Sequence, residues 1–297
     1  MQFYSLYYVL SPRMESLILD ILDFFNSPTG KKILSPFGGQ PVEEFLNYLA
    51  SHQMEMYLWT LGFLFLLSIV SQIKHLVING ITNRRISKIT SERPRILNEG
   101  QEKKILVLGD STGYGTGADK IEDTLLGRFA HDFPQVEVNN YAVNGSTTNN
   151  LLYQLEKVEN KKYNLTIISS GGNDTWKFTN LTSLERDLRS AVIKAKEITG
   201  NNVVLIIYNN KDSWPVFPFF LRYFILKRTR QVNEIYTRIA QEFGIQAVPI
   251  FLPGEKCPPN FFSRDGLHPS SEGYRIMYIR LWAELYAHRY DYNLRDY

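Results

Sequence analysis

From Lys104 onward, short apolar and β-branched runs alternate with longer stretches whose apolar residues recur at helical spacing. The runs that predict strands are 105–108, 136–138, 165–168, 203–207 and 246–250. The stretches that predict helices lie near 118–131, 147–158, 181–198, 222–242 and 271–288. Short, uniformly apolar strands are covered on both faces, and their alternation with helices implies right-handed crossovers. The pattern therefore predicts an α/β fold in three layers, with a five-stranded parallel sheet between helices.

The chain before this region contains a long stretch without charged residues. Residues 56–73, between Glu55 and Lys74, carry no formal charge. At about 1.5 Å per residue they would form roughly 27 Å of helix, close to the thickness of a bilayer's hydrocarbon core. We predict one transmembrane helix over 56–76, and a buried helix of a soluble protein is the alternative.

The segments on either side of this helix complete the predicted organisation. Residues 1–55 contain an apolar run interrupted by Asp20 and Asp23, which predicts an N-terminal helical region. Residues 77–101 are basic and contain turn formers such as Asn79-Gly80, as expected of a linker near lipid headgroups. Because the positive charges follow the span, we expect the domain over 102–297 on the cytoplasmic side of the membrane.

Charge and cysteine content exclude several functions. The formal net charge of the 297-residue chain is only +3, so there is no basic field for nucleic-acid binding. The single cysteine, Cys257, allows neither an internal disulfide nor a zinc site built on cysteine pairs.

Four polar clusters follow predicted strands. They are Gly109-Asp110-Ser111-Thr112-Gly113, Asn144-Gly145-Ser146, Gly171-Gly172-Asn173-Asp174 and Asp265-Gly266-Leu267-His268-Pro269. Each alone is typical of a turn, but the carboxyl ends of parallel strands meet at one edge of the sheet. Together the clusters contain the groups that acyl transfer requires: a nucleophile, a base, an acid that orients the base, and donors to an oxyanion.

The roles follow from position. Ser111, on the glycine-flanked turn after the first strand, is the candidate nucleophile, and His268 is the candidate base. Asp265 lies three residues before His268, so its carboxylate can meet one nitrogen of the imidazole ring. The remaining histidines are better read as ordinary surface or core residues: His52, His75, His131 and His288.

The oxyanion donors would be the backbone N–H groups of Ser111 and Gly145 and the side-chain amide of Asn173. Asp110 is expected to hold the turn rather than to take part in the chemistry.

Taken in order, the four clusters resemble the sequence blocks of the SGNH (GDSL-like) hydrolase superfamily over roughly the last 195 residues. The resemblance implies a flavodoxin-like sheet and serine esterase chemistry without a metal or other cofactor. It places Ser111, Gly145, Asn173 and His268 at the four name-giving positions and Asp265 as the third member of the triad. Thr112 stands where the name motif has leucine, at a position that carries no chemistry.

Three other interpretations fit parts of this sequence. Gly109-x-Ser111-x-Gly113 also fits the nucleophile elbow of α/β-hydrolases, but those enzymes place several strands before the serine. Gly113-x-Gly115-x-x-Ala118 imitates a dinucleotide fingerprint, but it begins four residues after the strand. A non-catalytic, membrane-tethered binding module on the same fold is the alternative from another class.

The physiological ester is less well defined by the sequence. The aromatic segment 214–226 is either a lid facing lipid or a helix packed on the core. A lipid-like or short acyl ester is the expected substrate, with a carbohydrate O-acetyl group as the alternative. The oligomeric state is left open.

Overall fold

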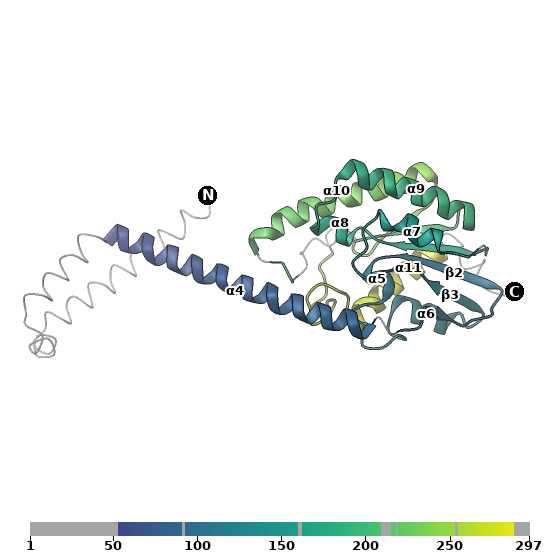
Figure 1. Ribbon diagram of the computed structural model, residues 1–297, viewed down its shortest axis with the longest axis horizontal. Coiled ribbons are helices and arrows are strands. Elements are labelled where there is room, and N and C mark those ends of the chain that lie inside the picture. Colours follow the sequence, from purple (N-terminus) through teal and green to yellow (C-terminus); the bar gives the residue numbers. More distant parts are fainter. Residues whose placement is uncertain are drawn as a thin grey trace, which may run out of the picture. The chain divides into compact units, whose positions relative to one another are not determined.

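The computed structural model describes residues 53–90, 93–159, 162–208, 215–217, 219–252 and 255–287. A six-stranded sheet of order β1-β3-β2-β4-β5-β6 crosses the compact unit Gln72–Tyr297 (Figure 1). Its strands are β1 (Ile96–Leu97), β2 (Lys103–Gly109), β3 (Val136–Asn140), β4 (Leu165–Ser169), β5 (Val203–Ile207) and β6 (Gln246–Pro249).

The five longer strands pair in parallel, which confirms the predicted strands and their orientation. The prediction of five strands is wrong by one, because β1 pairs antiparallel with β3. β1 is only two residues long, and it is a strand because it lies against the edge of β3. So short a segment has no periodicity of its own that a sequence pattern could show.

Helices cover both faces of the sheet (Figure 1). They and the two short helices at strand ends are α5 (Ser111–Tyr114), α6 (Leu125–Asp132), α7 (Asn150–Glu156), α8 (Gly172–Trp176), α9 (Leu181–Thr199), α10 (Phe219–Phe243) and α11 (Ser271–Ala287). α6 and α11 pack on one face of the sheet, and α7, α9 and α10 pack on the other. The predicted three layers are therefore present.

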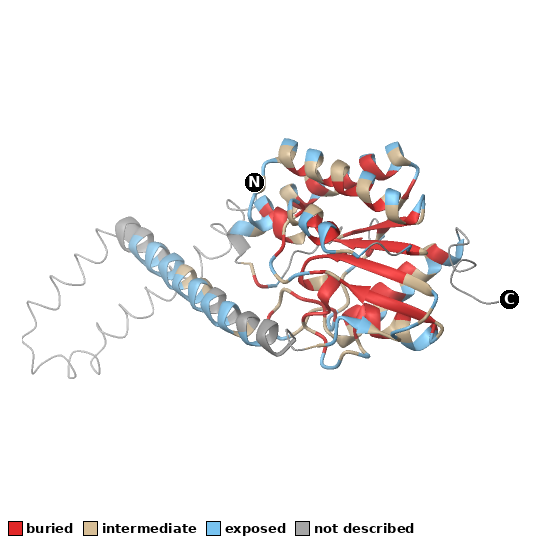
Figure 2. Cartoon of the chain, turned by 45° about the vertical axis from the view of Figure 1, so that its right-hand side comes forward, coloured by how far each residue is buried: buried red, intermediate tan, exposed pale blue. Residues whose placement is uncertain are grey.

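The four central strands β2, β3, β4 and β5 are buried along most or all of their length (Figure 2). In β2, Ile105 and Val107 pack into the layer of α6 and α11, while Leu106 and Leu108 pack into the layer of α7, α9 and α10. Side chains alternate across a strand, so a continuous apolar run fills both layers.

The helix α4 (Gln53–Thr90) continues through Asn79-Gly80, where we expected a linker over 77–101. One glycine in a long helix costs only about 1 kcal/mol, so the turn-like pair does not end it. Beyond α4, residues of the expected linker contact the sheet domain: Arg93 donates to the carbonyls of Gly115 and Ala118. The segment after residue 92 is thus part of the folded domain.

Among the residues that the structure describes, no helix has the combined length and hydropathy of a membrane span. The membrane helix over 56–76, the side of the membrane and the other domain limits stay predictions. Residues 1–52, which are most of the predicted N-terminal helical region 1–55, lie outside the described residues.

The described part of the aromatic segment 214–226 packs on the domain through one of its faces. Val216 and Ile225 are buried in a small cluster that includes Leu267, the neighbour of His268. The Val216 N–H also donates to the Gly266 carbonyl at 3.0 Å. The inner face of the segment is therefore core that supports the loop carrying His268.

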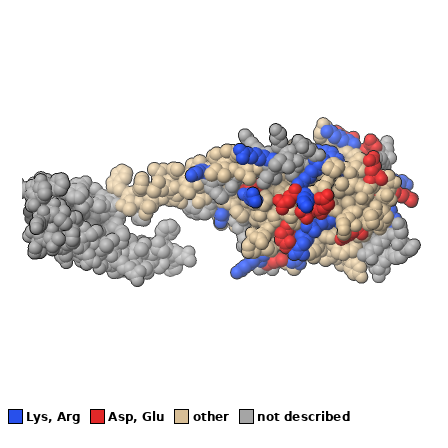
Figure 3. Space-filling view, turned by 90° about the horizontal axis from the view of Figure 1, so that it is seen from below, with Lys and Arg blue, Asp and Glu red and all other residues tan. Residues whose placement is uncertain are grey.

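The charged surface of the domain is mixed. On the face drawn in Figure 3, acidic and basic side chains lie among one another. Ion pairs join Arg128 to Asp123 and Arg275 to Glu272. Interspersed charges of this kind cancel one another's field at a distance. That nucleic acid is not a partner stays a prediction.

Candidate active site

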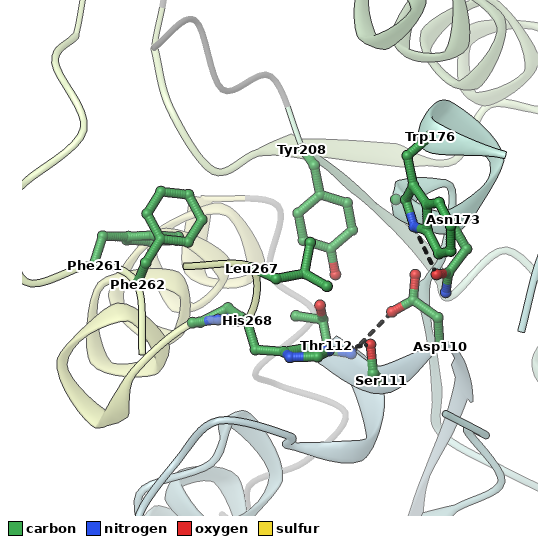
Figure 4. A pocket seen from close by; sticks show the side chains of 12 residues that line it. Asp110, Ser111, Thr112, Asn173, Trp176, Tyr208, Phe261, Phe262, Leu267 and His268 are labelled. Atoms are coloured by element: carbon green, nitrogen blue, oxygen red, sulfur yellow. Dashed lines mark hydrogen bonds between the residues drawn. The ribbon is translucent and has the colours of Figure 1, made fainter. Parts of the chain in front are cut away.

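A small pocket lies at the carboxyl ends of β2 and β4, the neighbouring strands between which the strand order reverses. Ligand sites of open α/β sheets form at this switch point. The cavity measures about 40 Å³. It is lined by Asp110, Ser111, Thr112, Gly172, Asn173, Trp176, Tyr208, Phe261, Phe262, Leu267, His268 and Pro269 (Figure 4).

Ser111 is the first residue of α5, and only Asp110 separates it from the end of β2. Asp110 caps this helix, because its carboxylate accepts the Thr112 N–H at 2.9 Å. Gly109 has a φ of +139°, and a Cβ there would lie 1.9 Å from the Ser169 carbonyl oxygen on β4. Only glycine fits between the two strands, so the turn that presents Ser111 depends on Gly109.

His268 and Asp265 reach Ser111 from the loop before α11. His268 Nε2 lies 2.8 Å from Ser111 Oγ, and His268 Nδ1 lies 2.6 Å from Asp265 Oδ2. All three residues are buried, Asp265 completely. Residues separated by 157 positions along the chain are thus joined in one hydrogen-bonded row.

The second oxygen of Asp265 fixes the loop. Asp265 Oδ1 accepts the N–H groups of Leu267 and His268 at 2.9 and 3.0 Å and the hydroxyl of Ser263 at 2.8 Å. Burial opposes ionisation of Asp265, but hydrogen bonds from the His268 ring and from the two N–H groups outweigh it and lower its pKa to about 2. Since an ionised carboxylate only accepts hydrogen bonds, the His268 proton must lie on Nδ1 when the ring is neutral. Nε2 is then free to accept the Ser111 proton.

Of the predicted oxyanion donors Asn173 and Gly145, one lines the pocket and the other does not. Asn173, in α8, lines the pocket together with Ser111. Gly145 is not among the pocket-lining residues; it has a φ of +77°, and its carbonyl accepts Lys177 Nζ at 2.8 Å. Its N–H group therefore stays a predicted donor.

Three residues at or beside the site were not predicted from the sequence. Gln154 of α7 is buried, and its side-chain amide bonds both the N–H and the carbonyl of Gly109, at 2.8 and 2.7 Å. Tyr208, directly after β5, lines the pocket and bonds Ser169. Trp176 lines it from α8. The only signal for Gln154 was a polar residue between Leu151 and Leu155 on an apolar helix face.

The alternative histidines lie elsewhere or outside the described residues. His131 is on the surface in the last turn of α6 and bonds its neighbour Asp132. His75 lies in α4, while His52 and His288 are not described. Within the described ranges, no three His, Cys, Asp or Glu side chains gather in a way that could hold a metal ion.

The sequence matches the GDSL-like Lipase/Acylhydrolase family over residues 107–276, more than half of the chain. The chain belongs to this GDSL-like family. It is therefore an ester hydrolase of the GDSL, or SGNH, type. The resemblance expected from the four clusters is confirmed at the level of the family.

Individual relatives are distant. An arylesterase of Vibrio mimicus is 28% identical over 174 residues, which are 57% of this GDSL-like chain and 82% of the relative. The structure of a G-D-S-L family protein from Desulfitobacterium hafniense has a TM-score of 0.50 at 19% identity, over 60% of this chain and 97% of that one. An acetylxylan esterase from Geobacillus stearothermophilus has a TM-score of 0.46 at 22% identity, over 64% and 96% of the two chains. At such identities the Desulfitobacterium likeness supports the fold alone.

Proposed function

We propose that the chain hydrolyses carboxylic esters of short acyl chains through an acyl-enzyme, with Ser111 as nucleophile, His268 as base and Asp265 as the acid that orients it. The observation that carries the proposal is the buried row of two hydrogen bonds from Asp265 through His268 to Ser111. A serine hydroxyl is a weak nucleophile until an adjacent base takes its proton, and this row supplies that base.

In the first half of the reaction, Ser111 Oγ attacks the ester carbonyl carbon while its proton passes to His268 Nε2. The carbonyl oxygen becomes negatively charged and would accept hydrogen bonds from the Ser111 N–H and the Asn173 amide, with the Gly145 N–H as the third predicted donor. His268 then gives the proton to the leaving alcohol oxygen as the carbon–oxygen bond breaks. The alcohol leaves, and the acyl group stays on Ser111.

In the second half, a water molecule replaces the alcohol. His268 takes a proton from the water, whose oxygen attacks the acyl carbon, and then returns the proton to Ser111 Oγ. The carboxylic acid is released. Throughout, the ionised Asp265 keeps the His268 ring in the required tautomer and stabilises the imidazolium when it forms.

The size of the pocket supports a short acyl group. Among the described residues its volume is about 40 Å³, smaller than a cavity of about 150 Å³ that holds benzene. Large side chains form the walls: Trp176, Tyr208, Phe261, Phe262 and Leu267. An acetyl group, including one on a carbohydrate, suits this space better than a long lipid chain. The family assignment also favours an enzyme over the non-catalytic binding module.

Covalent labelling tests the triad. We expect a fluorophosphonate to label the full-length protein in detergent, and we expect Ser111→Ala and His268→Ala to abolish labelling while melting near the wild-type temperature. His131→Ala is the matched control, because His131 lies away from the pocket and should leave labelling unchanged. Labelling of folded Ser111→Ala at the wild-type level would refute the assignment of the nucleophile.

A chain-length series tests the acyl group. With p-nitrophenyl esters from acetate to dodecanoate below their micellar concentrations, kcat/KM should be highest for acetate or propionate. We expect a fall of at least about tenfold by octanoate, since a methylene without room in a pocket changes binding by about 1–3 kcal/mol. A rate that rises with chain length would favour the lipid-like substrate instead.

A further inference from the structure

The amide of Asn173 is held between two partners. Its Oδ1 accepts the indole N–H of Trp176 at 3.0 Å, and its Nδ2 donates to the Ser146 carbonyl at 2.8 Å (Figure 4 shows the first bond). Asn173 and Trp176 both belong to α8, one turn apart. Ser146 belongs to the loop that also carries Gly145. One side chain thus connects α8 to this loop.

The partners leave the amide a single orientation. An indole N–H can only donate a hydrogen bond, so the Asn173 oxygen must face Trp176. A backbone carbonyl can only accept, so the NH₂ group must face Ser146. The NH₂ group has two hydrogens, and the Ser146 carbonyl takes one of them. The other remains for an acceptor in the pocket that Asn173 lines with Ser111.

The reversed orientation would be harmful. An amide that rotates by half a turn presents its oxygen where the NH₂ group was, and that oxygen would repel a developing oxyanion rather than stabilise it. Donors must be in place before the charge develops, because reorganisation during the reaction reduces their effect. Any group that prevents this rotation therefore raises the rate of the chemical step.

We propose that Trp176 is a positioning residue of the esterase: its indole N–H holds the Asn173 amide with the NH₂ group toward the oxyanion. The inference rests on the proposed function, in which Asn173 is an oxyanion donor. Trp176 acts through Asn173 and donates no hydrogen bond to the substrate.

Trp176 is also a wall of the pocket, and this second role must be separated from the first. Its side chain is partly exposed, at 39% for the residue, so a change there disturbs little of the core. Trp176→Phe keeps an aromatic ring at the wall and removes only the N–H donor and part of the ring. A wall residue acts mainly on substrate binding, whereas a positioning residue acts on kcat.

The test is a double-mutant cycle on p-nitrophenyl acetate, with full-length wild type, Trp176→Phe, Asn173→Ala and the double variant. We expect Asn173→Ala to lower kcat by about 10²–10³-fold, the usual effect of losing one oxyanion donor. Trp176→Phe should lower kcat by about fivefold to twentyfold and change KM by less than about threefold. In the double variant, Trp176→Phe should have no further effect, because the side chain through which it acts is gone.

A second tryptophan provides the matched control. Trp282 lies on α11, in the opposite layer, and packs beside Phe133. Trp282→Phe makes the same chemical change away from the pocket and should leave kcat within about twofold of wild type. Thermal melting of each variant shows whether a loss of activity comes from unfolding.

The outcomes separate the inference from the proposed function. If Asn173→Ala is impaired but Trp176→Phe has wild-type kcat, or if Trp176→Phe lowers kcat equally in both backgrounds, the positioning role is refuted and the triad stands. If Asn173→Ala has wild-type kcat, the proposed oxyanion role is wrong and the inference is lost with it. Activity in Ser111→Ala would refute the proposed function at its centre.

Discussion

Asp265 is a fully buried carboxylate whose two oxygens serve different purposes. One oxygen accepts a hydrogen bond from His268 Nδ1–H, and the other holds the loop by accepting hydrogen bonds from Leu267, His268 and Ser263. With a pKa of about 2, the group stays ionised at any pH near neutrality. The residue therefore combines a structural and an electrostatic role at one position.

Replacing the charge while keeping the shape separates these roles. In Asp265→Asn, the amide oxygen can still accept the loop N–H groups, but the amide NH₂ faces His268 Nδ1 and favours the tautomer with the proton on Nε2. We expect kcat to fall by at least about 10²-fold with little change in KM. Steady-state kinetics beside a melting curve will show this, and an active Asp265→Asn would mean that the carboxylate only shapes the loop.

The pKa of Asp110, next to the nucleophile, is shifted in the opposite direction to that of Asp265. Burial raises the pKa of its carboxyl to about 7. In the unfolded chain the group ionises near pH 4, so between about pH 4 and 7 the folded protein holds a proton that the unfolded chain has lost. The free energy of unfolding therefore falls as the pH rises through this window.

Asp110→Asn should remove this pH dependence. The amide oxygen can still accept the Thr112 N–H that Asp110 caps, but nothing ionises. Relative to wild type, we expect the variant to gain about 2–3 kcal/mol of stability between pH 5 and pH 8, since each pKa unit corresponds to 1.36 kcal/mol. Urea unfolding at the two pH values measures the gain. An equal difference at both would show that Asp110 is ionised throughout.

At the scale of elements, Glu137 links β3 to β2 and to the turn before β2. It is buried and accepts hydrogen bonds from Asn139 Nδ2 and the Gly100 N–H, both at 2.8 Å, and it pairs with Lys104 Nζ at 2.6 Å. Burial opposes its ionisation, but these three partners lower the pKa of Glu137 to about 2. One carboxylate thus binds donor groups on β3, on β2 and in the turn before β2.

Glu137→Gln should weaken this junction in a pH-dependent way. A depressed pKa stabilises the fold fully above about pH 4.5, and the contribution is lost as the pH falls toward 2. By urea unfolding at pH 7, we expect Glu137→Gln to lower the free energy of unfolding by about 2–3 kcal/mol. At pH 3 the loss should be smaller by roughly 2 kcal/mol. Glu156→Gln, at an exposed position of α7, is the control and should change stability by less than about 0.5 kcal/mol. A pH-independent effect of Glu137→Gln would point to packing instead of charge.

At the scale of the whole molecule, the segment 93–101 joins the sheet domain at several places. Asn98 Nδ2 donates to the carbonyl of Ala130 at 2.8 Å, at the end of α6, and Arg95 donates to the carbonyl of Ala142 at 3.0 Å. β1 closes the edge of β3, and Arg93 bonds the turn after Ser111. A domain cut at residue 102 loses all of these contacts.

Truncation tests the importance of this segment. Of two fragments, 93–297 and 102–297, we expect the shorter to be less stable by roughly 2–5 kcal/mol, because each lost hydrogen bond removes about 0.5–1.5 kcal/mol and an edge strand is opened. Urea midpoints compare them directly, and Asn98→Ala in the longer fragment should produce part of the loss. Equal midpoints would mean that 93–101 only lies on the surface.

Particular residues show which features could be predicted from the sequence. The runs 105–108 and 203–207 predicted their strands because buried parallel strands are continuous apolar runs, a signal each segment carries by itself. Ser111, Asp265 and His268 could be predicted to meet because parallel topology brings strand ends to one edge. β1 and Gln154 could not be predicted. A two-residue strand exists only through its partner, and a buried glutamine depends on the backbone that it faces.

By itself, the sequence determined the layered α/β architecture and the set of reactive side chains, because both follow from local periodicity and from the order of segments along the chain. The tertiary structure alone decided that 93–101 belongs to the domain, that the pocket is small, and that Trp176 contacts Asn173 while Gly145 lies outside the pocket lining. These features depend on distances and angles between groups that different segments bring together. No residue pattern within one segment encodes them.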